Sequence, residues 1–180
     1  METPKLSEDF YKLLHQLEGF PPYSDDLKRY VPYLCPAGKW THGFGSLLYG
    51  AEDTLLTSKN CDFNYALKVS NVRNLDDCKT LLIRELEKRS QKLFLLFCNT
   101  ELLPHQYEAL LLFYYNCGVS DTLFSMVINQ YPFATISNWW CTHYVTANGK
   151  KLNGLIRRRE IEAMLFIHGY EKLYSLEIMK

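Results

Sequence analysis

The sequence predicts an α+β fold that is mainly α, with a small region of strands and loops near the N-terminus. Two observations predict it: apolar residues recur at helical spacing in most of the chain after residue 74, and prolines and glycines interrupt residues 20–50. The 180 residues suffice for one compact domain, and neither an internal repeat nor a low-complexity tract divides them. We therefore expect a single folded domain.

The first helix is expected to begin at Ser7 and to end near Gly19. A serine hydroxyl can cap a helix, and the two acidic residues that follow suit the positive end of the helix dipole. The apolar positions at helical spacing are Phe10, Leu13, Leu14 and Leu17. Glu18 therefore stands at the helix C-terminus, where the dipole opposes a carboxylate and favours its protonated form.

After this helix, the sequence predicts loops and short strands first and helices from residue 74 onward. Residues 20–50 predict loops with short strands or a hairpin, and irregular structure is expected to continue to Arg73. The helices expected after that cover residues 74–97, 104–118, 121–130, 132–144 and 152–167. Asn74 or Asp76 can cap the first of them, and Pro104 suits the first turn of the second. Asn148-Gly149 predicts a turn before the last helix.

Charge and hydropathy exclude several classes of protein. Twenty basic residues balance 20 acidic ones, so the chain lacks the basic excess typical of nucleic-acid binding. The longest apolar run, Ala109 to Tyr115, is too short to span a membrane. Residues 1–17 carry several charges and no small-residue cleavage site, unlike a secretory signal. We expect synthesis in the cytoplasm and release by a separate protein.

The cysteines and histidines do not predict a metal site. The six cysteines are never spaced as C-x-x-C, and the histidines are dispersed, so neither a zinc site nor a redox motif is indicated. Without an export signal, reduced thiols are expected rather than disulfides. We expect the protein to need no metal and no other cofactor.

Three blocks of sequence are more specific. The first joins Glu18-Gly19-Phe20 to YLCPAGKWTHGFG at residues 33–45, the second is QYEALLLFYYNCG at 106–118, and the third is GLIRRREIEAMLF at 154–166. On these blocks the sequence resembles the phage-type lysozymes, the muramidase and endolysin group of glycoside hydrolase family 24. The resemblance implies a lysozyme-like fold of two lobes with the substrate between them. An N-terminal catalytic lobe would cover about 1–74, a linking helix about 75–98 and a helical lobe about 99–180.

The same resemblance implies the reaction and its residues. The family cleaves the bond between N-acetylmuramic acid and N-acetylglucosamine in peptidoglycan. Glu18 would be the catalytic acid, Cys35 would occupy the place usually held by an aspartate, and Thr41 would complete the site. Glycosidic cleavage needs an acid at the leaving oxygen and a second group that stabilises positive charge, activates water or attacks directly. Lysozymes keep their catalytic acid protonated through a raised pKa, and the resemblance implies the same for Glu18.

Cys35 departs from the family pattern. A thiolate could attack or supply negative charge, but a thiol is mostly neutral unless its surroundings lower its pKa. Cys35 lies 17 positions after Glu18 (35 − 18 = 17). This separation exceeds the family's usual spacing and implies an extra loop over about 21–30. Asp25 and Asp26 in that loop could replace the missing aspartate, or they are solvated turn residues. Ser46 stands where the family often has a histidine.

The resemblance also implies contacts with the substrate. The substrate-binding candidates are Tyr33, Gly43, Phe44, Tyr115, Asn116 and Arg157. Of the adjacent Trp139 and Trp140, at least one is expected in the core because neighbours on a helix diverge, and the other could be a sugar platform. Basic residues between 148 and 159 could attract an anionic wall polymer, while Arg158 is expected to pair with Glu162 on an exposed helix face.

We therefore interpret the protein as a peptidoglycan N-acetylmuramidase that acts on glycan strands as a monomer, with neither nucleic acid nor a membrane span involved. A phage endolysin and an effector delivered into a competitor both fit. Two alternatives remain at this point. One is a catalytically impaired relative that only binds glycan, as Cys35 suggests. The other is a lytic transglycosylase, which also needs one acidic Glu.

Overall fold

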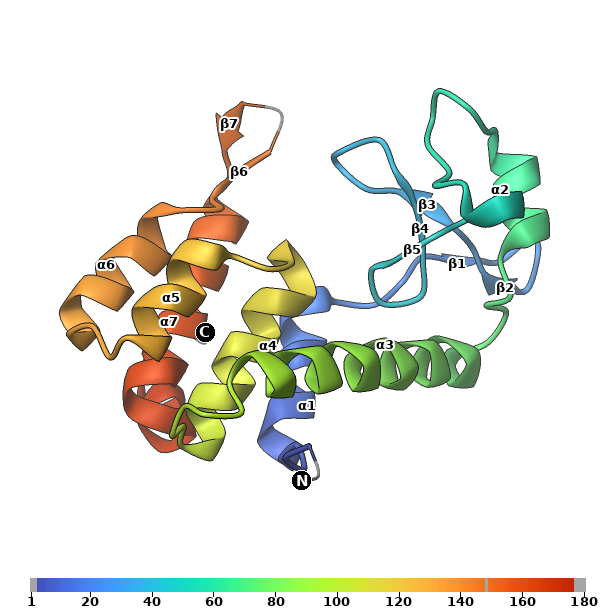
Figure 1. Ribbon diagram of the computed structural model, residues 1–180. Coiled ribbons are helices and arrows are strands. Elements are labelled where there is room, and N and C mark those ends of the chain that lie inside the picture. The colour runs from blue at the N-terminus through green and yellow to red at the C-terminus, as the bar shows by residue number, and fades with distance from the viewer. Residues whose placement is uncertain (1–2, 148, 177–180) are drawn as a thin grey trace. The chain divides into compact units, whose positions relative to one another are not determined.

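The computed structural model describes residues 3–147 and 149–176 (Figure 1). Contacts divide the chain into two compact units. We call His15–Glu87 the β-unit, and the described residues up to Leu14 and from Lys88 onward the helical unit. The divisions fall inside two helices, α1 (Glu8–Glu18) and α3 (Leu75–Leu96), so each of these helices contributes to both units.

Short antiparallel strands form the first half of the β-unit, as the proline and glycine pattern predicts. One hairpin pairs β1 (Tyr23–Ser24) with β2 (Arg29–Tyr30). A three-stranded sheet in the order β3-β4-β5 follows, with bounds Tyr33–Leu34, Trp40–His42 and Ser46–Leu47. In its register Tyr33 lies opposite Thr41. The loop expected over residues 21–30 is therefore a hairpin.

The β-unit has a small core of its own around Trp40. Trp40, Leu48, Leu56 and Ala66 are buried together, and the indole Nε1 of Trp40 donates to the Cys61 carbonyl at 3.0 Å. The backbone hydrogen bonds of Trp40, Leu48 and Leu56 also join these three segments. The core therefore fixes β4, the strand that carries Thr41.

The expectation of irregular structure through Arg73 is wrong. A 3₁₀ turn, η1, covers Ala51–Asp53, and the helix α2 covers Phe63–Val69. The carboxylate of Asp62 caps α2 by accepting a hydrogen bond from the Tyr65 amide at 2.8 Å. Only Ala66 is buried in this seven-residue helix, so its sequence carries almost no apolar periodicity.

The predicted ends of α1 and α3 are confirmed. Ser7 Oγ accepts from the Phe10 amide at 3.1 Å, and Gly19 ends α1 with a left-handed φ of 66°. The Asn74 side chain caps α3 by accepting from the Asp77 amide at 2.9 Å. The Asp77 carboxylate in turn accepts a hydrogen bond from the Asn74 backbone amide at 3.1 Å, which completes a capping box.

The start of α1 is also anchored within the helical unit. The backbone amide of Ser7 donates to Glu108 Oε1 at 2.6 Å, and its hydroxyl donates to Oε2 at 3.0 Å. Glu108 is only 3% exposed and lies on α4. A bidentate contact of this kind orients the first turn of α1.

The helical unit is built around α4 (Figure 1). Its other elements are α5, α6, the β6-β7 hairpin and α7. The bounds in chain order are Pro104–Cys117, Asp121–Ile128, Phe133–Thr142, Thr146–Ala147, Lys150–Lys151 and Asn153–Ser175. Every residue from Gln106 to Tyr114 is buried, and α7 packs against both α4 and α6. Of the expected Asn148-Gly149 turn, Asn148 lies outside the described residues.

The last helix extends beyond the predicted end at Ile167. It continues to Ser175 across Gly169, whose φ of 74° interrupts the helical backbone. A side chain at Gly169 would meet the ring of His105 at 3.4 Å, so glycine suits both the conformation and the space. Leu173 beyond this kink is fully buried, which explains why the helix continues.

The predicted fold class, α+β and mainly α, is confirmed. Among the described residues, no helix combines the length and the apolar character that crossing a membrane requires. All six cysteines are free thiols, and Cys78 is the one that is fully buried.

Candidate active site

Glu18 is the last residue of α1, as the sequence predicts. Its side chain is half-buried, and its Oε1 atom is shielded from solvent. Gly19 follows in the left-handed conformation and donates its amide to the His15 carbonyl at 3.0 Å. The helix end and the reversal after it therefore fix the backbone of Glu18.

The hairpin between β3 and β4 holds Cys35 in a tight turn. The Cys35 amide donates to the Lys39 carbonyl at 2.9 Å, and the Gly38 amide donates to the Cys35 carbonyl at 2.8 Å. Gly38 has a φ of 71°, which a side chain would strain. Cys35 is half-buried at the start of this turn.

Tyr33 links Glu18 and Cys35 electrostatically. Burial, together with the charges of Glu18, Cys35 and Cys78, raises the pKa of the Tyr33 phenol to about 12, and burial is the largest of these causes. The interaction requires these groups to lie near the phenol. Within the β-unit, the structure thus brings together two of the predicted catalytic residues and one predicted substrate contact. The phenol stays neutral at physiological pH and can donate a hydrogen bond.

Thr41 lies opposite Tyr33 on β4 and is 3% exposed. Its hydroxyl donates to the Lys39 carbonyl at 3.2 Å. Because that bond engages the hydroxyl hydrogen, the oxygen lone pairs remain available as acceptors.

The residues after Thr41 pack the hairpin against the rest of the β-unit. His42 is buried, its Nδ1 lies 3.2 Å from Ser70 Oγ, and burial lowers its pKa to about 4. The nearby Arg84 contributes to this lowering of the pKa, whereas Glu85 opposes it. His42 is therefore neutral at pH 7. It lies opposite Ser46, which is also buried.

Gly43 and Phe44 are packing residues in this structure. Gly43 has a φ of 56°, and an added side chain would meet Leu81 at 3.4 Å. The buried Phe44 ring packs edge-on against His15 with centroids 5.0 Å apart and lies 6.5 Å from the ring of Phe20. Phe20 itself is 80% exposed, two residues after Glu18.

Asp25 and Asp26 lie in the turn between β1 and β2, and both are exposed. The turn also includes Lys28, whose φ of 51° is left-handed. This placement matches the solvated-turn interpretation of the two aspartates.

In the helical unit, Tyr115 and Asn116 lie in the last turn of α4. The guanidinium of Arg89 lies 5.0 Å from the centroid of the Tyr115 ring. Arg159 donates from Nη2 to Asn116 Oδ1 at 2.8 Å and also contacts the Cys117 thiol. The Asn116 amide is thus oriented with its oxygen toward Arg159, which leaves its NH₂ group as a donor.

The expected pairing of Arg158 with Glu162 is present, but the expectation that it lies on an exposed face is wrong. Arg158 Nε and Arg159 Nη2 donate to Glu162 Oε1 at 3.0 and 2.9 Å, and Trp140 Nε1 donates to Oε2 at 3.1 Å. Glu162 and Arg159 have no exposed surface. Burial raises the pKa of Glu162, and the guanidinium groups and Trp140 oppose that shift. Helical spacing predicts which residues pair, but not whether the pair faces the core.

The other predicted contacts of the helical unit are at its surface. Arg157, Lys150 and Lys151 are exposed. Trp140 is fully buried, which confirms that one tryptophan of the pair belongs to the core. Trp139 is half-buried and stacks on His143, with centroids 4.3 Å apart and an angle of 9° between the rings.

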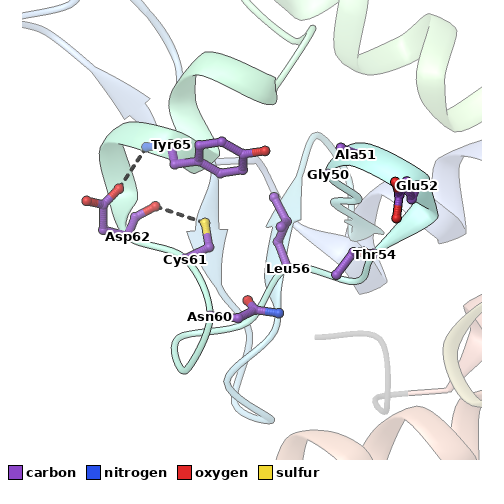
Figure 2. A pocket seen from close by; sticks show the side chains of 9 residues that line it. All are labelled: Gly50, Ala51, Glu52, Thr54, Leu56, Asn60, Cys61, Asp62 and Tyr65. Carbon is purple, nitrogen blue, oxygen red and sulfur yellow. Dashed lines mark hydrogen bonds between the residues drawn. The ribbon is translucent and has the colours of Figure 1, made fainter.

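The β-unit also contains a cavity of about 630 Å³ that none of the predicted site residues lines. Figure 2 shows it between Leu56, Tyr65 and Glu52, with the Cys61 thiol donating to the Asp62 carbonyl at 3.1 Å. Within the described parts of the chain, no group of three or more His, Cys, Asp or Glu side chains could hold a metal.

The predictions did not include the partner of Asn116. Arg157 is the arginine predicted to bind substrate, whereas Arg159 is the one that donates to Asn116. The signal that could have found it is the spacing of Glu162, which is three residues from Arg159 as well as four from Arg158.

Comparison with protein families gives one match that covers most of the chain. The family model described as phage lysozyme matches residues 17–162, which include Glu18, the β3–β4 hairpin and the Glu162 cluster. The chain belongs to the phage lysozyme family. The protein is therefore a lysozyme-type glycosidase, and peptidoglycan is its class of substrate. No significant match was found among curated proteins.

Solved structures show that the lysozyme fold extends over nearly the whole chain. A muramidase domain of SpmX from Asticaccaulis excentricus has a TM-score of 0.61 at 23% identity, over 91% of this chain and 97% of that one. An endolysin from Escherichia coli O157:H7 phage FAHEc1 has a TM-score of 0.60 at 18% identity, over 94% and 97%. The active form of the P1 phage endolysin Lyz has a TM-score of 0.54 at 18% identity, over 91% and 85%.

Proposed function

We propose that the protein hydrolyses the bond between N-acetylmuramic acid and N-acetylglucosamine in peptidoglycan, with Glu18 as the general acid. The observation that carries this proposal is the family match over residues 17–162, which begins one residue before Glu18. Glu18 donates its proton to the leaving glycosidic oxygen. Its place at the end of α1, where Gly19 reverses the chain, and its solvent-shielded Oε1 support this role.

Cys35 and Thr41 act at the anomeric carbon, where positive charge develops and water attacks. Cys35 stands where the family resemblance implies an aspartate, and it stabilises the positive charge that develops on the sugar. Thr41 orients the water whose oxygen bonds to the anomeric carbon. The hydrogen bond from its hydroxyl to Lys39 supports this role, because the remaining lone pairs can accept from that water.

Further residues bind the substrate. Tyr33 donates from its neutral phenol, and the raised pKa of that group supports its donor role. The backbone around Gly43 and Phe44 approaches the sugar. Asn116 binds an N-acetyl oxygen through the NH₂ group that Arg159 leaves open. Tyr115 and Arg157 complete the set, and the single domain of two lobes acts as a monomer after its release from the producing cell.

The decisive experiment compares Glu18→Gln with Glu8→Gln on purified peptidoglycan. The amide keeps the shape of the acid but cannot supply the proton, so release of reducing ends should fall by a factor on the order of 10²–10⁴. Glu8 is an exposed acid on the same helix, and its substitution should leave the rate unchanged within about twofold. Full activity of Glu18→Gln would remove Glu18 from the mechanism.

The products test the reaction type. Hydrolysis adds water, so mass spectrometry should find muropeptides with reducing ends. A set of anhydro-sugars would instead identify a lytic transglycosylase. Glycan binding without any released ends would identify an inactive relative.

A further inference from the structure

The helical unit contains a cavity that the proposed reaction does not use. It has a volume of about 420 Å³, which falls in the usual range for sites that bind small ligands. The chain segments around it are the α3–α4 connection, the α5–α6 connection and one face each of α4 and α7. The apolar part of its wall comes from Leu102, Val127, Pro132, Ile136 and Phe166, and the polar part from Thr100, Glu101, Gln106 and Gln130.

Of the polar side chains that line the cavity, Gln106 is the buried one. Gln106 is 8% exposed, and its Oε1 accepts a hydrogen bond from the Leu103 amide at the start of α4, at 3.0 Å. Its Nε2 donates no hydrogen bond to any group in residues 3–147 and 149–176. The cavity therefore offers a donor for the carbonyl oxygen of a ligand.

The rim of the cavity is aromatic. Tyr131 and Phe133 are 48% and 50% exposed, and the ring of Phe133 packs edge-on against Phe166 with centroids 6.0 Å apart. Half-exposed aromatic rings at the edge of a cavity suit the apolar face of a sugar ring. A fitting ligand thus combines a carbonyl oxygen for Gln106, a small apolar group beside that carbonyl, and a ring for the rim.

We propose that this cavity binds the N-acetyl group of an amino sugar and provides a second glycan contact in the helical unit. The carbonyl oxygen accepts from Gln106 Nε2, the methyl group packs against the apolar wall, and the sugar ring lies on Tyr131 and Phe133. The choice of an amino sugar rests on the proposed function. A peptide carbonyl has similar acceptor chemistry but no pyranose ring, and it serves as the competing ligand in the test.

The direct test is NMR of the ¹⁵N-labelled full chain, read at the side-chain NH₂ signals of Gln106. Three probes are titrated separately: N-acetylglucosamine, glucosamine, and the dipeptide L-alanyl-D-isoglutamine. We expect saturable shifts with N-acetylglucosamine alone. Equal shifts with glucosamine would overturn the N-acetyl assignment, a response to the dipeptide alone would assign the cavity to peptide, and no response to any probe would overturn the proposal.

A matched pair of variants tests the donor. Gln106→Glu keeps an oxygen acceptor for the Leu103 amide and places a carboxylate at a helix N-terminus, where it is favoured, but it removes the NH₂ group. Gln130→Glu adds the same charge at an exposed lining position. Affinity for N-acetylglucosamine, read at the backbone amide of Ile136, should fall about tenfold in Gln106→Glu. It should change less than about twofold in Gln130→Glu, and equal losses in both variants would contradict the donor role.

Kinetics separate this proposal from the proposed function. Gln106→Glu should raise KM on insoluble peptidoglycan severalfold while leaving the hydrolysis of short soluble glycan fragments unchanged. If the protein releases reducing ends but Gln106 does not respond to N-acetylglucosamine, the cavity proposal is wrong and the proposed function stands. If Gln106 responds but no reducing ends are released, the proposed function is wrong and the cavity proposal stands.

Discussion

The role proposed for Cys35 is that of the aspartate implied by the family resemblance. The tight turn from Cys35 to Lys39 fixes the backbone of Cys35, and the charges of Glu18 and Cys35 both raise the pKa of the Tyr33 phenol. A carboxylate could occupy the same turn, since the backbone hydrogen bonds there do not involve the side chain. Cys35 is therefore the position where a single substitution distinguishes a role for charge from a role for the thiol.

We expect Cys35→Asp to keep lytic activity and Cys35→Ser to lose a factor on the order of 10² in kcat. Aspartate supplies the negative charge that the reaction needs, whereas a serine hydroxyl stays neutral. Rates of reducing-end release measure both variants, and circular dichroism checks that both are folded. A Cys35→Ser protein as active as the parent would mean that Asp25, Asp26 or water does this work.

His42 makes the stability of the β-unit depend on pH. Its pKa is about 4 in the folded protein and about 6.5 in the unfolded chain. Below pH 6.5 the unfolded state therefore binds the additional proton. The stability linked to His42 is fully present above pH 6.5 and is lost as the pH falls toward 4, by about 3 kcal/mol if the whole shift of 2.5 units acts.

The test measures unfolding by urea at several pH values for the parent and for His42→Asn. The parent should lose more stability than the variant between pH 6.5 and 4, because the variant has no imidazole to protonate. His168→Asn, at an exposed position, should follow the parent. Parallel curves for the parent and His42→Asn would contradict the assignment.

Helix ends were the most predictable parts of this fold. Caps depend on one or two residues with fixed chemistry, so Ser7, Asn74 and Gly118 mark real boundaries of α1, α3 and α4. Helix lengths were less predictable. α2 was missed because its seven residues bury only Ala66, and α7 runs on to Ser175 because Leu173 is buried beyond the kink at Gly169.

Removing the cap of α3 should destabilise the protein. We expect Asn74→Ala to lower the free energy of unfolding by about 1 kcal/mol, because the Asp77 amide loses its acceptor. Asn74→Asp keeps an oxygen at the same place and should remain within a few tenths of a kcal/mol of the parent. Chemical unfolding monitored by circular dichroism measures both, and an equal loss in the two variants would rule out the cap as the cause.

Over the whole chain, composition and motif order predicted the fold class, and sequence spacing predicted which charged residues would meet. Neither could predict how deeply those charged residues are buried. Glu162 and its arginines are fully or almost fully buried, a consequence of α4, α6 and α7 packing together rather than of any local pattern. The same limit applies to the candidate site: the residues of each motif were identifiable, but the proximity of Tyr33 to Glu18 depends on the fold of the β-unit.

Glu162→Gln should cost the protein about 3–5 kcal/mol of stability, since it leaves two buried guanidinium groups without their carboxylate. Glu171→Gln on the same helix is exposed and should cost less than about 0.5 kcal/mol. Thermal and urea unfolding of the two variants provide the comparison. A Glu162→Gln protein as stable as the parent would show that the cluster contributes no net stability.

The bidentate contact between Ser7 and Glu108 has a practical consequence for anyone who shortens or extends the gene. Ser7 directly precedes α1, and the proposed acid Glu18 is the last residue of that helix. The contacts of Ser7 with Glu108 therefore attach the helix that carries Glu18, although Ser7 lies in an N-terminal segment that is easily cut away in cloning. Affinity tags belong ahead of Ser7. Trimming past it would detach the first turn of the helix that ends at Glu18, although the deleted residues contain no part of the reaction chemistry.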